Sequence, residues 1–257
     1  MPKRWPFRAS GSALGTGVST VGVASTAGSR AAEGGVSGIR RAATLPVRFF
    51  NRPAEVVARE LLGRTVVSRV GGVMASGRIV ETEAYLGFDD PASHGYRHRR
   101  NERNAALFGP PGTWYVYLSY GVHWCANLVC EEAGRASAVL LRALEPLRAI
   151  DVMATRRGTP DLRLLCSGPG RLCQALGITR SLDGMAMRRS PVTIVSGPAV
   201  AEPDTEATPR IGITKAADWP LRYALAGSPW TSRTRLSAAR SLSARPSRSP
   251  DRSASRR

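Results

Sequence analysis

The chain has 257 residues and carries 37 lysines and arginines against 19 aspartates and glutamates, a formal net charge of +18. The basic surplus gathers at the ends, because residues 1–41 carry +5, residues 231–257 carry +7 and the longer middle carries only +6. Such a surplus suits a polyanionic partner such as nucleic acid or an anionic membrane, although arginine-rich composition alone produces the same numbers. The sequence holds no run of about 18 uncharged apolar residues, so we expect no membrane-spanning segment.

Few residues of the chain suit a metal or a disulfide. Its four cysteines form no C-x-x-C pair, and its three histidines lack the H-E-x-x-H spacing, so we expect neither a metal site nor a cofactor. So few cysteines in a chain of this size indicate reduced thiols in an intracellular, cytoplasmic protein. Lys3 and Arg4 are followed by no continuous apolar stretch, which argues against a secretory signal.

Both ends of the chain lack apolar periodicity. Residues 1–43 are rich in glycine, alanine and serine, and residues 233–257 are dominated by arginine and serine. Segments of this composition bury too little apolar surface to offset the entropy of ordering. We therefore expect two disordered tails, the second of them basic, around a single folded domain of residues 44–232.

The first predicted elements of this domain are a helix and two strands. Pro53 begins a helical pattern that Gly63 ends. Strand-like runs follow at 65–70 and 79–87. Residues 88–113 are polar and rich in arginine, glycine and proline, and they predict a long surface loop with a helical turn.

Residues 114–129 are strand-like on both sides of Gly121, which predicts a β-hairpin with Tyr120 near its tip. The later expected elements are a strand at 138–144, a helix that Pro146 begins, a helix from Pro169 to near Gly177, and strands at 191–196 and 210–214. The order shows no strict β-α-β alternation. This favours an α+β domain with a mostly antiparallel, curved β-sheet flanked by helices.

The segment I-V-E-T-E-A-Y-L-G, residues 79–87, combines carboxylates with a strand pattern. Strands alternate faces, so Glu81, Glu83 and Tyr85 share one face. Because carboxylates are costly to bury, the pattern alone favours an edge strand with a solvated face. The alternative is a carboxylate in an apolar, aromatic pocket, where desolvation or the neighbouring acid raises its pKa toward that of a general base.

Two further residues stand out against their surroundings. Arg142 interrupts the apolar run A-V-L-L-R-A-L, and it either pairs with a buried carboxylate such as Glu83 or extends to solvent at a strand edge. Tyr120, beside Gly121 at the predicted hairpin tip, is poorly placed for ordinary packing. On a basic body, an outward aromatic side chain suits insertion into a base stack.

Five runs of the sequence, in order, resemble those of the alkyladenine (3-methyladenine) DNA glycosylases. They are V-E-T-E-A-Y-L-G, F-G-P-P-G-T-W-Y-V-Y-L-S-Y-G-V-H-W-C-A-N, L-L-R-A-L-E-P, C-S-G-P-G-R-L-C-Q-A-L-G-I and R-Y-A-L-A-G-S-P-W. The resemblance covers residues 45–232 and not the tails. It implies a monofunctional base-excision enzyme that flips a damaged purine out of duplex DNA into a pocket, where water replaces the base at C1′.

The resemblance also implies roles for individual residues. Glu83 matches the acid that positions and deprotonates the water, and Arg142 matches the arginine that holds the water and the carboxylate. Tyr120 matches the hairpin tyrosine that fills the gap left by the flipped nucleotide. Tyr85, His94 and Tyr117 match the walls of the base pocket. Asn127 matches the residue that discriminates against guanine.

The expected partner is double-stranded DNA containing damaged purines. We expect a cytoplasmic monomer that associates with the nucleoid through this binding to DNA. Glycosylases that also cut the backbone use an amine, and Lys215 is the only lysine within residues 44–232, which favours simple hydrolysis. Two alternatives stay open: a DNA-binding protein without catalysis, and a hydrolase of free nucleosides. The chain departs from the family pattern in the arginine-rich loop 97–104 and in Val122, which is smaller than the residue of some relatives.

Overall fold

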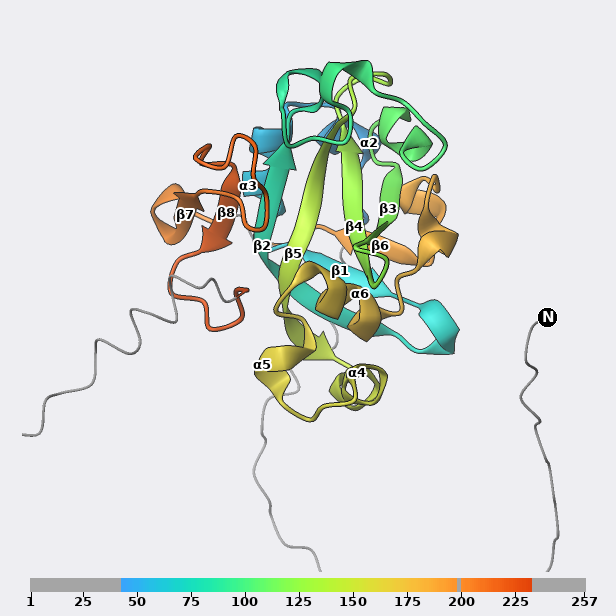
Figure 1. The fold of residues 1–257 in the computed structure, drawn as a ribbon. Helices are drawn as coiled ribbons and strands as arrows, with labels where there is room; N and C mark the ends of the chain where they lie inside the picture. Colours follow the sequence, from blue (N-terminus) through green and yellow to red (C-terminus); the bar gives the residue numbers. More distant parts are fainter. Residues whose placement is uncertain (1–42, 198–199, 233–257) are drawn as a thin grey trace, which may run out of the picture.

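Antiparallel β-strands form one open sheet that organises the part of the chain described by the computed structural model, residues 43–197 and 200–232 (Figure 1). All but the last residue of the predicted N-terminal tail, and the whole C-terminal tail, lie outside these ranges. The strands are β1 (Thr65–Ser68), β2 (Ala75–Tyr85), β3 (Trp114–Ser119), β4 (His123–Cys130), β5 (Ser137–Arg148), β6 (Val192–Val195), β7 (Thr205–Thr208) and β8 (Arg222–Leu225). The predicted α+β class with a mostly antiparallel sheet is confirmed, since every strand pair is antiparallel.

Helices pack around this sheet. They are α2 (Val47–Phe50), α3 (Ala54–Leu61), α4 (Ile150–Arg157), α5 (Leu162–Leu165) and α6 (Pro169–Leu176). In the view of Figure 1, α3 lies behind the sheet and α6 in front of it. The Thr82 hydroxyl donates to the Ala58 carbonyl oxygen at 2.9 Å and so joins β2 to α3. Within the described ranges, no helix is long and apolar enough to cross a membrane.

The strand that carries the two glutamates lies inside the sheet, and the expectation of an edge strand with a solvated face was wrong. The strand order is β3-β4-β5-β2-β1-β6, and β8 pairs with the second half of β2 on the side opposite β5. Glu81 lies opposite Ala224 of β8, and Glu83 lies opposite Arg222. Both glutamates and Thr82 between them are fully buried, because helix α3 covers the Thr82 face and side chains that include Arg142 cover the other.

Strands β3 and β4 pair along their whole length, from Trp114 opposite Leu128 to Ser119 opposite His123. Residues 120–122 connect them. Tyr120 has 90% of its surface exposed and adopts a left-handed backbone conformation with φ of 50°. The turn therefore presents a large aromatic side chain to solvent, whereas such side chains are usually packed against other residues.

The prediction of a helix that begins at Pro146 was wrong. Pro146 begins no helix, because β5 continues through it to Arg148. Pro146 lies opposite Gly77, where the register between β2 and β5 shifts. Such an irregular ladder tolerates a residue that lacks an N–H group. The next helix begins only at Ile150.

Residues 210–214 do not form the predicted strand, although residues 211–213 line the cavity described below. The sequence pattern also missed β7 and β8, which have four residues each and too few alternations to be recognised. The predicted helix at 169–177 and the strand at 191–196 are present as α6 and β6.

Candidate active site

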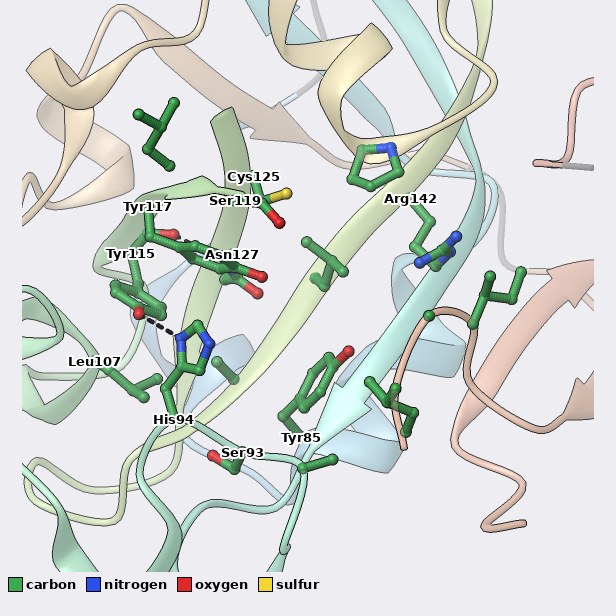
Figure 2. Close-up of a pocket in the computed structure, with 18 of the residues that line it drawn as sticks. Tyr85, Ser93, His94, Leu107, Tyr115, Tyr117, Ser119, Cys125, Asn127 and Arg142 are labelled. Carbon is green, nitrogen blue, oxygen red and sulfur yellow. Dashed lines mark hydrogen bonds between the residues drawn. The ribbon is translucent and has the colours of Figure 1, made fainter. Parts of the chain in front are cut away.

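A cavity of about 560 Å³ opens between the β3–β4 hairpin, strand β5, the end of β2 and two irregular loops (Figure 2). One loop contains residues 92–94 and the other contains residues 211–213. Of the residues predicted for the site, those that line this cavity are Tyr85, His94, Tyr117, Tyr120, Asn127 and Arg142. The structure therefore brings together side chains that lie as far as 57 positions apart in the sequence.

Glu83 lies directly behind the cavity wall and not on it. The Arg142 guanidinium pairs with Glu83 Oε1 at 3.2 Å, and the Ile211 backbone N–H donates to the same oxygen at 2.8 Å. The Tyr85 hydroxyl donates to Glu83 Oε2 at 2.9 Å. All three partners line the cavity, so the carboxylate reaches the cavity wall through them.

The pKa of Glu83 is raised above the ordinary glutamate value, first because burial penalises the charged carboxylate. The positive charge of Arg142 and the hydrogen bonds from Ile211 and Tyr85 oppose this rise without cancelling it. The negative charge of Glu81 makes the smallest contribution to the rise. Glu83 is thus a buried carboxylate with increased affinity for a proton, which is the property of a general base.

Glu81 has a different environment, although it lies on the same strand only two residues away. Its Oε1 accepts from Arg142 at 3.1 Å, from Arg222 at 2.7 Å and from the Ser232 hydroxyl at 2.6 Å. Its Oε2 accepts from the Ser232 backbone N–H. Arg142 also donates to the Ser232 hydroxyl at 3.2 Å, so Arg142, Glu81 and Ser232 bond to one another and Arg222 joins them through Glu81.

Burial by itself would raise the pKa of Glu81, but the charges of Arg142 and Arg222 and the hydrogen bonds from Ser232 bring it below the ordinary value. Glu81 is therefore held as an anion. The sequence left open whether Glu81 raises the pKa of Glu83 or pairs with an arginine. In the structure it pairs with two arginines, and its effect on Glu83 is small.

Three aromatic side chains form the opposite wall of the cavity (Figure 2). The rings of Tyr115 and Tyr117 are stacked with centroids 5.4 Å apart, and His94 meets Tyr117 edge-on at 4.6 Å. His94 Nδ1 and the Tyr115 hydroxyl are hydrogen-bonded at 2.7 Å. Desolvation lowers the pKa of His94, which favours a neutral imidazole in this wall.

Asn127 projects from β4 into the cavity and is almost fully buried. Its amide nitrogen donates to the carbonyl oxygen of Tyr115, its cross-strand partner, at 3.1 Å. This bond limits the rotation of the amide. Asn127 is thus a rigid polar group among aromatic rings.

The sequence-based site missed four residues that contact its members. Tyr115 and Ile211 line the cavity, while Arg222 and Ser232 hold Glu81. Arg222 lies within the run R-Y-A-L-A-G-S-P-W, so a signal was present, but its partner lies 141 positions earlier in the chain. Ile211 acts through its backbone, which no residue type could reveal.

The site shows no arrangement for a metal. Across residues 43–197 and 200–232, no group of three or more histidine, cysteine, aspartate or glutamate side chains could hold an ion. The four cysteines are buried and free.

The substitution Glu81→Gln tests the network. It leaves Arg222 buried without its anionic partner, so we expect the free energy of unfolding to fall by about 3 kcal/mol or more. Urea denaturation measures this change. The matched control is Glu60→Gln, because Glu60 pairs with Arg52 at 2.8 Å but both side chains are substantially exposed; a loss below about 1 kcal/mol is expected there. Equal losses in the two variants would contradict the central role of Glu81.

Comparison with known proteins gives a consistent result. The model of the family described as methylpurine-DNA glycosylase (MPG) matches residues 48–229. A relative from Rhodopseudomonas palustris (strain HaA2) is 52% identical over 186 residues, covering 72% of this chain and 88% of the relative. Relatives from Koribacter versatilis (48% over 201 residues, 76% and 96% covered) and Nitrosospira multiformis (50% over 184 residues, 72% and 91% covered) carry the same name, "Putative 3-methyladenine DNA glycosylase". The chain belongs to the methylpurine-DNA glycosylase family.

Proposed function

We propose that this protein is a DNA glycosylase that flips alkylated or deaminated purines out of duplex DNA and hydrolyses the N-glycosyl bond, leaving an abasic site. Membership of the family and the names of its relatives support a DNA glycosylase for alkylated bases. The observation that carries the mechanism is Glu83, a buried carboxylate of raised pKa that contacts Arg142 and Tyr85 at the wall of an aromatic cavity.

Glu83 is suited to the chemistry of the sugar. Breaking an N-glycosyl bond develops positive charge on the ring, much as glycoside hydrolysis does. A carboxylate next to this charge stabilises it and accepts the proton of the attacking water. Arg142 helps to hold the carboxylate and the water, and it stays fixed because Glu81 and Ser232 bind its other nitrogens.

The aromatic walls are suited to the damaged base. Tyr85 on one side and His94 and Tyr117 on the other form a slot for a flat purine. Stacking on these rings is favourable for every purine and is increased by cation–π attraction for a positively charged methylated base. Selectivity then comes in part from the lower cost of unstacking a damaged or mispaired base.

Asn127 provides discrimination against guanine. A buried amide held against the Tyr115 carbonyl leaves little freedom to move away from an exocyclic amine. A normal guanine carries an exocyclic amine on C2, whereas adenine and hypoxanthine have only hydrogen on that carbon. We therefore assign Asn127 the rejection of undamaged guanine.

Two surface features are suited to duplex DNA. Tyr120 extends from the hairpin turn, where it can fill the gap left by a flipped nucleotide. Loop 97–104 presents exposed arginines, and its shape is preformed because the Asn104 amide donates to the carbonyl oxygens of His94 and Arg99 at 3.0 and 2.7 Å. Such arginines neutralise backbone phosphates.

The reaction needs no amine nucleophile. Lys215 is exposed and does not line the cavity, so it is poorly placed to attack a sugar inside it. We propose a monofunctional enzyme without a cofactor, which acts as a cytoplasmic monomer on DNA.

The substitution Glu83→Gln should abolish excision and preserve binding, because glutamine cannot accept the proton of the water while Arg142 keeps Glu81 as its partner. Single-turnover release of hypoxanthine, ethenoadenine or methylated purines from duplexes should slow about a hundredfold to ten-thousandfold. The control Glu60→Gln should release base like the wild type. Retained turnover in Glu83→Gln would remove Glu83 from this role. Borohydride trapping should give no covalent adduct; an adduct lost in Lys215→Ala would contradict simple hydrolysis.

Excision should also fall on the acidic side of the pH profile. As the pH decreases through the raised pKa of Glu83, the carboxylate gains a proton and can no longer take one from water. We expect the midpoint of this decline to lie above the ordinary glutamate value of 4.5. Single-turnover rates between about pH 4 and 8, corrected for spontaneous depurination, measure it. A midpoint at or below the ordinary value would exclude Glu83 as the base.

The substitution Tyr120→Ser should weaken lesion-specific binding, because the gap in the base stack is then left unfilled. We expect the dissociation constant for an ethenoadenine duplex to rise about tenfold while that for undamaged duplex changes little. The control is Leu162→Ser, which removes another exposed apolar side chain, on α5. Unchanged lesion affinity in Tyr120→Ser would argue against insertion.

A further inference from the structure

Asp90 and Arg210 form a second buried ion pair, outside the network around Glu81. Arg210 Nη2 donates to Asp90 Oδ1 at 2.9 Å, and Nη1 donates to Oδ2 and to the Ala84 carbonyl oxygen, the latter at 3.0 Å. Both side chains are fully buried. Neither residue lines the cavity, so the pair is not available to a flipped base.

The Arg210 guanidinium packs over the ring of Tyr85. Its central carbon lies 4.7 Å from the ring centroid, within the range of a cation–π contact. Tyr85 lines the cavity and Arg210 does not, so the guanidinium covers a part of the ring that is turned away from the cavity. Within the described ranges, Arg210 Nε has no hydrogen-bond acceptor, which leaves Asp90, Ala84 and the Tyr85 ring to define its position.

Asp90 also determines the shape of the loop after β2. Its Oδ2 accepts from the Leu86 backbone N–H at 3.2 Å, and its Oδ1 accepts from the Ala92 N–H at 3.0 Å. These bonds close the turn that leads to His94. This loop has no β-ladder to support it, and the carboxylate of Asp90 supplies two of the hydrogen bonds that order it.

The same pair acts on both uncharged donors to Glu83. Arg210 directly precedes Ile211, whose N–H donates to Glu83 Oε1. It also packs on Tyr85, whose hydroxyl donates to Glu83 Oε2. A displacement of Arg210 would therefore move a pocket wall and two of the three groups that hold the carboxylate.

Stability alone does not explain such a pair. Desolvation of two charges offsets most of their attraction, and apolar or neutral replacements of similar volume are often equally stable. What an apolar pair lacks is the directional, two-oxygen geometry that locates a guanidinium. Positioning is thus the property that the pair adds at this place.

We infer that Asp90 and Arg210 are positioning residues for base excision, which hold the Tyr85 ring and the Ile211 N–H against Glu83. This inference rests on the proposed function, because it assigns Tyr85 and Glu83 to the excision site. It predicts that fold stability and excision respond differently to neutral replacement of the pair.

The test is the double variant Asp90→Asn with Arg210→Met, in which methionine fills the volume but has no defined position. We expect its melting temperature to stay within a few degrees of the wild type. Single-turnover excision of ethenoadenine should fall about tenfold or more, since misplacement of catalytic groups by about 1 Å costs as much as a hundredfold. Affinity for undamaged duplex should not change, because the exposed arginines set it.

The control replaces a different ion pair, Arg78 of β2 with Glu145 of β5, by methionine and glutamine; this pair is partly exposed. Neither residue lines the cavity, so excision should stay at the wild-type rate. A second variant, Arg210→Lys, keeps the charge and one contact to Asp90 but loses the planar fork. It should lie between the wild type and the double variant, with about a threefold to fivefold loss.

The outcomes separate the two proposals. A wild-type protein that releases no base from any lesion duplex would overturn the proposed function and this inference with it. If the wild type excises and both the Arg210→Lys variant and the double variant excise at the wild-type rate, the inference alone is overturned. Parallel loss of melting temperature, excision and undamaged-DNA affinity would also overturn it, because the pair would then be a general support of the fold.

Discussion

The charge of Glu81 in the middle of the sheet is the constraint on which the site depends. A fully buried carboxylate is stable only when positive charge and hydrogen-bond donors surround it. Arg142 comes from β5, Arg222 from β8, and Ser232 from the end of the described chain. The strands on both sides of β2 and a segment 151 positions away are thereby held at one point. The same network holds the Arg142 guanidinium, which also pairs with Glu83.

Two carboxylates on one strand face thus acquire opposite properties. Glu81 has two arginines and a serine, and its pKa is lowered. Glu83 shares one arginine and otherwise accepts from the neutral groups of Tyr85 and Ile211, and its pKa is raised. The second arginine and the two hydrogen bonds from Ser232 lower the pKa of Glu81, and Glu83 has no counterpart to Arg222. The charged form is therefore favoured at Glu81 and disfavoured at Glu83.

The two sides of the cavity are held by different physical means. On the hairpin side, the β-ladder fixes Tyr115, Tyr117 and Asn127, and alternation in the sequence predicted those strands. The loops after β2 and before β8, which carry His94 and Ile211, have no ladder, and side chains bonded to backbone groups take its place. This explains why residues 210–214 were mistaken for a strand: their apolar alternation is real, but no neighbouring strand pairs with them.

The sequence by itself determined which side chains share a face of β2, the α+β class, and, through the order of its motifs, several of the residues that meet around the cavity. It predicted a partner for Arg142 but not the division of that arginine between two glutamates. Only the tertiary structure decided that β2 is internal, that Glu81 is an anion and that Glu83 is not equivalent to it. Alternation is a local property with a period of two residues, whereas the pKa of Glu81 depends on charges and hydrogen-bond donors that the fold brings close from 61 to 151 positions away.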